Sequence, residues 1–291
     1  MMLKIFQKGF NYSQDGQGNR LVYHLQGCNM KCPWCANPEG MAMDGVIYTD
    51  KDWLNDELCP KGAVKEGKLD RSVCAECEDR TCLSVKYKSK GIRLSYEERT
   101  VDEVYKEILS SSPMFYDGGG VTFTGGEATM QFEALKELLI RLKEAGIHTA
   151  IETNGTHPRL PELFPYIDQL IMDFKHWDEK KHKQFTGVSL EMVVNNLKKA
   201  VKEHECVDVR IPLIGGVNDS KEDMEKFTEF FKTLGGDNVT FEILKYHEFG
   251  KNKWEECGWT YQMDEKAHVT VEQIKYFREL ITSCGLNYKR S

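Results

Sequence analysis

Three cysteines near the start of the chain have the spacing of an iron–sulfur ligand set: Cys28, Cys32 and Cys35. Closely spaced thiolates on one loop can wrap one face of a cubane cluster. Because no fourth ligand lies beside them, one iron would stay open for a substrate, whereas a cluster used only for electron transfer is normally closed by four thiolates. The spacing alone leaves zinc as the alternative, completed by His24 or by a distant thiol.

A second group of cysteines lies further along the chain: Cys59, Cys74, Cys77 and Cys82. Four thiolates are a full set for a closed 4Fe-4S cluster or for tetrahedral zinc. We expect one auxiliary 4Fe-4S cluster here, with zinc as the alternative, and both an electron-relay role and a purely structural role stay open. The remaining cysteines are expected to be ordinary thiols: Cys206, Cys257 and Cys284.

The composition restricts the kind of protein that could carry these thiols. Ten cysteines in 291 residues, with no signal-peptide pattern at the start, are not typical of a short secreted disulfide scaffold. A net charge of −7 without a basic block argues against a nucleic-acid surface. No run of about eighteen apolar residues would span a membrane. We therefore expect a cytoplasmic protein whose clustered thiols bind metal.

These thiols must be positioned by a regular alternation of strands and helices. Period-two and β-branched runs predict six strands, at residues 21–25, 121–124, 147–152, 170–173, 207–213 and 239–244. Amphipathic spacing predicts helices between them, with caps at Thr100, Asp219-Ser220 and Thr270 and a stop at Gly146. This rhythm predicts parallel strands with crossover helices, in either a doubly wound sheet or a partial barrel.

One stretch interrupts the alternation. Residues 41–95 are rich in Lys and Glu, weak in periodicity, and contain the second cysteine group. We therefore expect residues 1–40 and 96–291 to form the main α/β domain, and residues 41–95 to form an insert held by its own metal site. In parallel α/β folds the carboxyl ends of the strands share one rim, so loops from distant parts of the chain can meet there.

Short motifs follow the predicted strands in a fixed order. After the three cysteines come Thr124-Gly125-Gly126-Glu127-Ala128, Glu152-Thr153-Asn154-Gly155, Asp173-Phe174-Lys175 and Tyr246-His247-Glu248-Phe249-Gly250-Lys251. In this order they resemble the radical S-adenosylmethionine (SAM) enzymes and, among these, the activating enzymes of glycyl radical enzymes. The resemblance runs from about residue 20 to about residue 255. It implies an α/β fold with a partial (β/α)6 barrel of the radical SAM type.

The resemblance also implies which residues bind the cofactors. SAM would chelate the open iron of the first cluster, Glu127 would accept from its ammonium group, and Arg210 would pair with its carboxylate. Gly125 and Gly126 would let the backbone approach a ligand that a Cβ would exclude. The other expected SAM contacts are Trp34, Cys35, Ala36, Asp173, Phe174, Lys175 and His247.

At two metal sites of the family, the residues of this sequence depart from the family's usual pattern. Glu152, Thr153 and Asp173 are similar to a family site for a monovalent cation, but Glu152 stands where the family typically has Asp. Many relatives carry a ferredoxin-like insert with two regular four-cysteine motifs. This chain has only four thiols in its insert, at irregular spacing, so we expect one auxiliary site.

The implied reaction is reductive cleavage of SAM. An external donor, typically flavodoxin or ferredoxin, would supply one electron, and the resulting 5′-deoxyadenosyl radical would take an α-hydrogen from a glycine of a large partner enzyme. No side-chain acid or base is required, so none is assigned as catalytic. The alternatives are a radical SAM enzyme acting on a small molecule or activating anaerobic ribonucleotide reductase, and a non-enzymatic cluster- or zinc-binding electron carrier.

Overall fold

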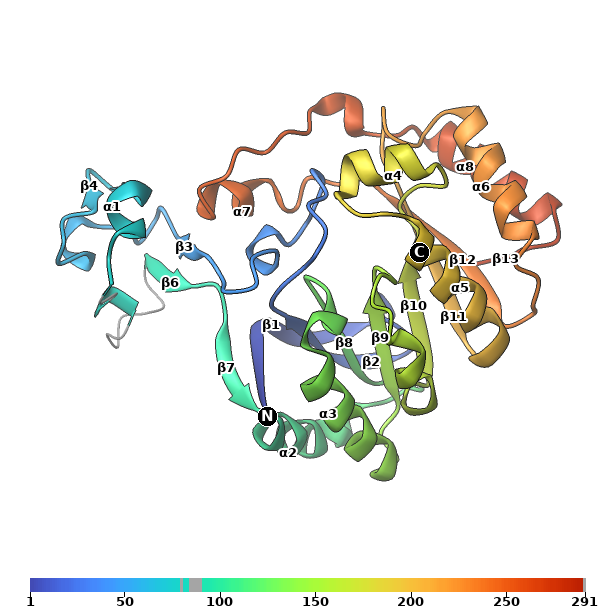
Figure 1. The fold of residues 1–291 in the computed structure, drawn as a ribbon, viewed down its shortest axis with the longest axis horizontal. Coiled ribbons are helices and arrows are strands. Elements are labelled where there is room, and N and C mark those ends of the chain that lie inside the picture. Colours follow the sequence, from blue (N-terminus) through green and yellow to red (C-terminus); the bar gives the residue numbers. More distant parts are fainter. Residues whose placement is uncertain (79–80, 84–90, 290–291) are drawn as a thin grey trace.

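The computed structural model describes residues 1–78, 81–83 and 91–289 (Figure 1). Its central feature is one large sheet. In chain order the strands of this sheet are β1 (Met2–Tyr12), β2 (Asn19–Leu25), β7 (Glu97–Thr100), β8 (Gly120–Gly125), β9 (Thr149–Thr153), β10 (Gln169–Asp173), β11 (Val207–Leu213), β12 (Val239–Lys245) and β13 (Asn287–Tyr288). In space they follow the order β13-β12-β11-β10-β9-β8-β2-β1-β7.

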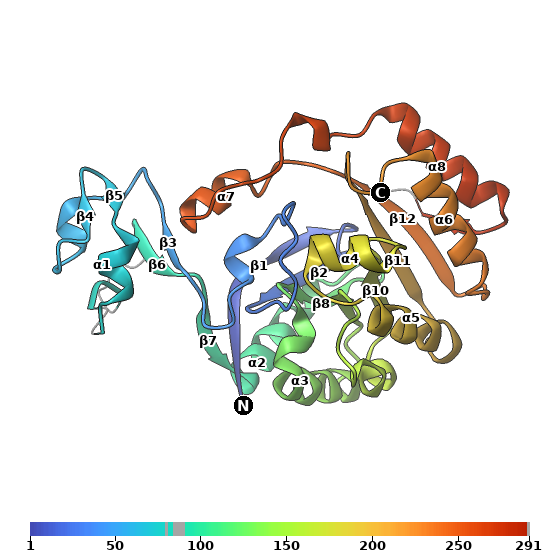
Figure 2. The ribbon, with the colours of Figure 1, turned by 45° about the horizontal axis from the view of Figure 1, so that its top comes forward.

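Most of the sheet is parallel. The strands from β2 through β8, β9, β10, β11 and β12 to β13 pair in parallel, whereas β1 is antiparallel to both β2 and β7. All six predicted strands are present within this parallel part, so the predicted α/β class is confirmed. The mostly parallel sheet, curved in Figure 2, is consistent with a partial barrel.

Helices connect the parallel strands and cover the outside of the sheet (Figures 1 and 2). The helices of this part are α2 (Val101–Ser111), α3 (Phe132–Glu144), α4 (Glu179–Thr186), α5 (Glu191–Glu203), α6 (Lys221–Lys232), α7 (Lys251–Glu256) and α8 (Val271–Ser283). The predicted caps are confirmed, because Thr100 and Thr270 each form a capping box and Ser220 accepts from the backbone N–H of Asp223. Gly146, with φ +69°, follows the end of α3 as predicted.

The core lies between the helices and the sheet. On α3, Leu135, Leu138 and Leu142 are fully buried. On α6, Phe227 and Phe231 are also fully buried. These residues recur at intervals of three and four, which is the helical period that places them on one face. Burying this face against the sheet fixes the strands, and so fixes the loops at their carboxyl ends.

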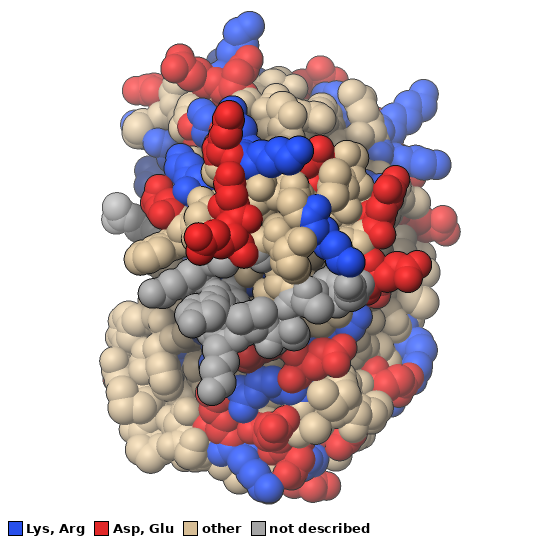
Figure 3. Space-filling view, turned by 90° about the vertical axis from the view of Figure 1, so that its left-hand side faces the viewer, with Lys and Arg blue, Asp and Glu red and all other residues tan. Residues whose placement is uncertain are grey.

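The cysteine-rich segment extends away from the sheet (Figure 1). Its elements are β3 (Ile47–Thr49), β4 (Val64–Lys65), β5 (Lys68–Leu69), α1 (Arg71–Ala75) and β6 (Ile92–Leu94). Strand β3 pairs with β6 where the chain leaves and re-enters the main domain, and β4 pairs with β5. On the face that shows this segment, acidic and basic side chains are interspersed (Figure 3).

Three strands of the main sheet were not predicted: β1, β7 and β13. In β1 only Leu3 and Ile5 are buried, and the rest of the strand is partly or fully exposed, so its apolar pattern is short. Helices α4 and α7 were not predicted either. No helix in the described part of the chain is both long enough and apolar enough to cross a bilayer.

Candidate functional site

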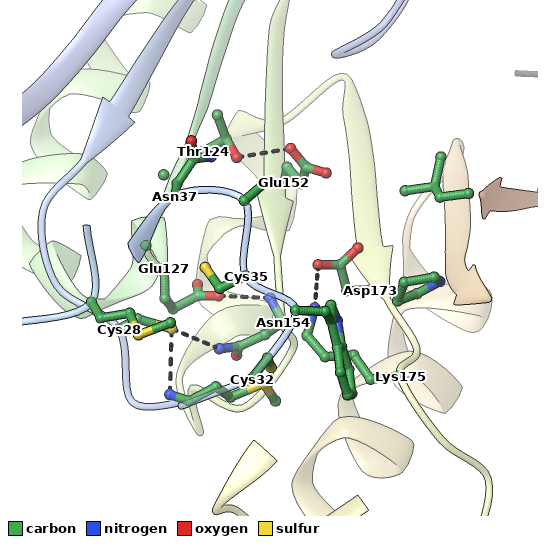
Figure 4. A pocket seen from close by; sticks show the side chains of 18 of the residues that line it. Cys28, Cys32, Cys35, Asn37, Thr124, Glu127, Glu152, Asn154, Asp173 and Lys175 are labelled. Atoms are coloured by element: carbon green, nitrogen blue, oxygen red, sulfur yellow. Dashed lines mark hydrogen bonds and ion pairs between the residues drawn. The ribbon is translucent and has the colours of Figure 1, made fainter. Parts of the chain in front are cut away.

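A cavity opens at the carboxyl ends of the parallel strands (Figure 4). It is lined by the loop after β2 and by the ends of β8, β9, β10, β11 and β12. The predicted residues that line it are Cys28, Cys32, Trp34, Cys35, Ala36, Gly125, Gly126, Glu127, Glu152, Thr153, Asp173, Lys175 and His247. Segments far apart in the sequence therefore meet at one rim, as expected for parallel strands.

The first cysteine group lies in the loop of residues 27–41, here called the cysteine loop. Its ends are held together because Gly27 N–H donates to Gly40 O at 2.8 Å and Cys28 N–H donates to Met41 O at 3.0 Å. Within it, Cys35 N–H donates to Cys32 O at 3.1 Å. The three thiols therefore face the cavity from one compact turn (Figure 4).

The thiols of the cysteine loop are in an environment that disfavours free thiolates. Burial raises the pKa of Cys28 and Cys32, and it raises the pKa of Cys35 to about 12. Nearby negative charge adds to this effect at Cys28 and Cys35, whereas Lys175 opposes it at Cys32. Met30 N–H and the Asn154 amide donate to Cys28 Sγ at 3.3 and 3.9 Å. Such buried thiols ionise readily only when a metal replaces the proton.

The Gly125-Gly126 turn is in close contact with the cysteine loop. A Cβ on Gly126 would lie 2.3 Å from Gly40 O and 2.4 Å from Gly27 O, and Gly125 has φ +131°. The expected reason for these glycines was close approach of a ligand. The structure gives a different reason, since the space that a Gly126 side chain would need is filled by the backbone of the cysteine loop.

Glu127 links the ends of β8 and β9. Its buried carboxylate accepts from the Thr153 hydroxyl at 2.7 Å, from Asn154 N–H at 2.6 Å and from Thr129 N–H at 3.0 Å. Burial raises the pKa of Glu127 despite these donors. Four protein hydrogen bonds, including one from the Thr129 hydroxyl at 2.5 Å, already hold this carboxylate. Its predicted contact with an ammonium group stays a prediction.

Asp173 and Lys175 form a half-buried ion pair at the end of β10 (Figure 4). The Lys175 ammonium lies 2.8 Å from the Asp173 carboxylate. Burial would lower the pKa of Lys175, but Asp173 and the nearby Cys32 outweigh burial, and the pKa is raised. The cavity therefore keeps a fixed positive charge beside the thiols.

Phe174, between these two residues, does not line the cavity. It is 1% exposed, and its ring stacks on Phe230 with a centroid separation of 5.0 Å. The side chains of a strand alternate between its two faces, so Asp173 and Lys175 face the cavity while Phe174 packs under α6. The structure thus gives Phe174 a place in the core and not in the predicted SAM contact set.

Arg210 is also not among the cavity-lining residues. Its Nη1 donates to Glu152 at 2.6 Å and its Nε donates to Glu242 at 2.8 Å. Glu152, which does line the cavity, also accepts from the Thr124 hydroxyl at 2.8 Å (Figure 4). Arg210 lies below the rim, inside β11, so it reaches the neighbouring strands and holds Glu152 from beneath. Its predicted pairing with a ligand carboxylate is not what the structure shows.

Some lining residues were not predicted. Asn154 reaches Cys28, and Tyr246 and Ile214 are 4% and 2% exposed beside the cysteine loop. Asn154 and Tyr246 lie within the motifs at the strand ends, which was the available signal. His247 is exposed at the rim and its ring lies 4.2 Å from that of Phe249, while partial burial lowers the pKa of His247.

The four insert cysteines belong to the described residues, and none of them is in a disulfide there: Cys59, Cys74, Cys77 and Cys82. Burial, and then Cys59, Cys74 and Cys77, raise the pKa of Cys82, so these three thiols lie near Cys82. Within the described residues, no group of three or more His, Cys, Asp or Glu side chains is arranged to hold a single metal ion. Each ligand of a cubane binds its own iron, so its thiols need not converge on one point.

Comparison with known proteins extends this picture. The sequence profile described as Radical SAM superfamily matches residues 22–231. The 4-hydroxyphenylacetate decarboxylase activating enzyme of Clostridioides difficile is 30% identical, over 94% of this chain and 90% of that protein. The choline trimethylamine-lyase activating enzyme of Oleidesulfovibrio alaskensis is 33% identical, over 86% of this chain and 85% of that protein. A crystal structure of a domain of pyruvate-formate lyase-activating enzyme from Bacteroides vulgatus has a TM-score of 0.50 and 26% identity, covering 60% of this chain and 99% of that domain.

Proposed function

Because this chain belongs to the radical SAM superfamily and, within it, to the activating enzymes of glycyl radical enzymes, we propose that its rim cavity binds a 4Fe-4S cluster and SAM to generate a glycyl radical on a partner enzyme. The observation that carries the proposal is the meeting of three thiols with the ends of five further strands in one cavity. A single active site that uses both a cluster and a nucleoside needs this convergence.

The donor set of the cavity fits a cluster with an open iron. Cys28, Cys32 and Cys35 supply three thiolates from one loop, which suits iron–sulfur chemistry. His24, the near alternative for completing a zinc site, is not among the residues that line the cavity. Its Nδ1 is buried and has no hydrogen-bond partner within the described residues. The lining therefore supports three thiolates with an open iron over a zinc site that His24 closes.

The remaining lining residues fit a charged nucleoside ligand. Lys175 and Asp173 offer opposite charges beside the thiols, and Glu127 lies at the Gly-Gly turn. Near the cysteine loop, the cavity is also lined by the rings of Trp34 and His247 and by the small apolar side chain of Ala36. These residues would hold SAM against the cluster, and a monovalent cation beside Glu152, Thr153 and Asp173 belongs to the same proposal. Phe174 and Arg210 would act from behind the lining residues.

When bound, the cluster and SAM supply reductive cleavage of the sulfonium C–S bond and the 5′-deoxyadenosyl radical. The chain's part is to orient the ligand and to limit access of water. Met30 and Trp34 of the cysteine loop pack in one cluster with Ile214, and these residues, which are 2%, 9% and 2% exposed, provide an apolar wall. Neither an acid nor a base is needed for this chemistry, and we assign no catalytic side chain.

We also propose the partners and the second site. The relatives are named for a decarboxylase and a lyase that they activate, so the substrate of this chain is proposed to be a glycine of such an enzyme. Flavodoxin or ferredoxin is the proposed electron donor. Residues 41–95 are proposed as an insert that carries one auxiliary 4Fe-4S cluster, supported by the proximity of its other three thiols to Cys82.

Anaerobic reconstitution tests the proposal. The loaded protein, with SAM and dithionite, should release 5′-deoxyadenosine and methionine in equal amounts. With a glycyl radical enzyme encoded next to its gene, it should give the electron paramagnetic resonance (EPR) doublet of a glycyl radical, whose α-proton splitting is lost in a sample labelled with deuterated glycine. SAM cleavage without a radical on any such partner would instead indicate that the substrate is a small molecule or a ribonucleotide reductase. No SAM cleavage at all would refute the proposal.

A further inference from the structure

Helix α7 lies between the cysteine loop and the cysteine-rich segment, two regions that both precede it in the sequence by more than a hundred and fifty residues (Figures 1 and 2). Both views show it between these regions, and hydrogen bonds join it to each of them. The proposed reaction gives α7 no role. Its contacts nevertheless fix the backbone at one of the three proposed cluster ligands.

On one side α7 holds the cysteine loop. Trp254, which is 9% exposed, donates from its indole Nε1 to Cys35 O at 2.9 Å. Lys253 Nζ donates to Asn37 Oδ1 at 2.9 Å and to the buried carboxylate of Glu39 at 2.7 Å. Two consecutive residues of α7 thus bind the segment of the cysteine loop that begins at Cys35.

The packing at this contact leaves no spare room. A Cβ on Gly250, which precedes α7, would lie 2.6 Å from Cys35 O and 2.8 Å from Ala36 Cα. The backbone before α7 therefore touches the backbone at the cluster ligand itself. Because such packed contacts transmit small shifts, a displacement of α7 must displace Cys35 or break the Trp254 hydrogen bond.

On its other side α7 holds the insert. Arg71 Nη2 donates to Glu256 O at 2.8 Å, and Arg71 Nη1 donates to Ile47 O at 2.7 Å. The Thr49 hydroxyl donates to the same Glu256 O at 3.1 Å, and the Tyr48 hydroxyl donates to the Glu256 carboxylate. The end of α7 is therefore tied to β3 and to the first residue of α1.

We propose that α7 couples the fold of the insert to the geometry of the SAM site. Arg71 of the insert and Trp254 of α7 are the two positioning residues of this connection. Arg71 opens α1, the helix that carries Cys74, so the fold of the second cysteine group sets where Arg71 can reach. The connection then runs through Glu256 and Trp254 to Cys35 O. The inference rests on the proposed function, since it takes Cys35 as a ligand of the SAM-binding cluster.

The experiment compares two variants of α7's contacts with a matched control. Arg71→Ala removes the contact with the insert, and Trp254→Phe removes only the indole N–H. Lys68→Ala changes an exposed residue of β5 in the same insert. Amide hydrogen exchange of residues 33–41 is followed in the cluster-loaded protein, and the dissociation constant of SAM is measured by equilibrium dialysis. Residues 197–213 serve as an internal reference for the barrel.

Both α7 variants should expose the cysteine loop more often while the barrel reference stays unchanged. Losing one or two hydrogen bonds should speed exchange of residues 33–41 and weaken SAM binding by about three- to tenfold, and Lys68→Ala should match the parent. The double variant should lose less than the product of the two single effects, because both act through one helix. Unchanged exchange in Arg71→Ala, or fully multiplicative losses, would overturn the coupling.

The exchange comparison needs no turnover. A parent protein that binds the cluster but cleaves no SAM would refute the proposed function, while the exchange of residues 33–41 would still decide whether the insert positions the cysteine loop. The two proposals can therefore fail separately.

Discussion

The buried Arg210, beneath the candidate site, forms an ion pair with the half-buried Glu152 in its lining, with Arg210 Nη1 2.6 Å from Glu152 Oε1. A second carboxylate, Glu242, lies 2.8 Å from Arg210 Nε. The two acidic groups hold the pKa of Arg210 well above its usual value in spite of burial. Arg210 therefore stays charged, and it fixes the orientation of a carboxylate that lines the cavity.

Replacing Arg210 should cost stability. Arg210→Met leaves the buried Glu242 and the half-buried Glu152 without their cation, and breaking a buried pair typically costs about 3–5 kcal/mol of unfolding free energy. Urea unfolding followed by circular dichroism measures this. The control is Arg159→Met, since Arg159 pairs with Glu133 and Glu162 at the surface, where ion pairs contribute little to stability, so this variant should lose far less. Similar losses in the two variants would contradict a structural role for Arg210.

Cys32→Ala should abolish SAM cleavage but preserve the fold. The thiol is one of three proposed cluster ligands, while the apolar core of the barrel does not depend on it. The variant should retain its circular dichroism spectrum and lose about one cluster's iron per chain, and 5′-deoxyadenosine should fall below detection. Cys284→Ala, at an exposed position, should behave as the parent protein. Persistent 5′-deoxyadenosine formation by Cys32→Ala would show that the ligand set is wrong.

Gly126→Ala should loosen the cysteine loop. The added methyl would meet the backbone oxygens of Gly27 and Gly40 at 2.4 and 2.3 Å, so the loop must shift. Overpacking of this kind costs about 1–3 kcal/mol. We expect lower iron retention on gel filtration as well as weaker SAM binding. Gly9→Ala, where a Cβ meets nothing within 4 Å, is the matched control. Normal iron retention in Gly126→Ala would argue that the turn contacts only the ligand.

Stability should decrease as the pH is lowered below about 6.5. Burial lowers the pKa of His24 to about 4, from 6.5 in the unfolded chain. The unfolded state then binds the proton more readily than the folded state. His24 therefore leaves the free energy of unfolding unchanged above pH 6.5 and lowers it progressively between pH 6.5 and about pH 4. At about 1.36 kcal/mol per pKa unit the full effect is about 3 kcal/mol. Burial also lowers the pKa of His148, His157, His176, His182, His204 and His247.

Thermal unfolding at about pH 7.5, 6.0 and 5.0 measures this dependence. His24→Gln should flatten the curve between about pH 6.5 and 5, since a glutamine side chain has no proton to bind in that range. A melting temperature that rises on acidification in this range would contradict the sign of the effect. An identical slope in the parent and in His24→Gln would remove His24 as a cause.

The sequence was sufficient to predict the parallel strands and the meeting of their motifs at one rim. These features depend on local periodicity and on the general geometry of parallel sheets. The capping residues Thr100, Ser220 and Thr270 were also predictable, because a helix cap is set by residues close in sequence. The same local reasoning could have separated Phe174 from Asp173 and Lys175, since strand side chains alternate.

Other features depend on contacts between distant residues. The pairing of Arg210 with Glu152 and Glu242 requires the register of β11 against its neighbours, in which Arg210 lies opposite Asp173 and Glu242. No local pattern encodes that register. Strand β1 was missed because only two of its residues are buried, and its pairing with β7 joins residues almost a hundred positions apart. The role of Gly126 also depends on a distant segment, the closed cysteine loop.

The central claim is that three thiols hold a cluster whose open iron binds SAM directly. Electron-nuclear double resonance on the reduced, reconstituted protein with SAM labelled with ¹⁵N at its amino group tests it most directly. We predict a ¹⁵N coupling to the cluster that is present in the parent protein and absent in Cys32→Ala. A reconstituted parent protein that binds labelled SAM without any such coupling, or that contains zinc in place of the cluster, would contradict the account.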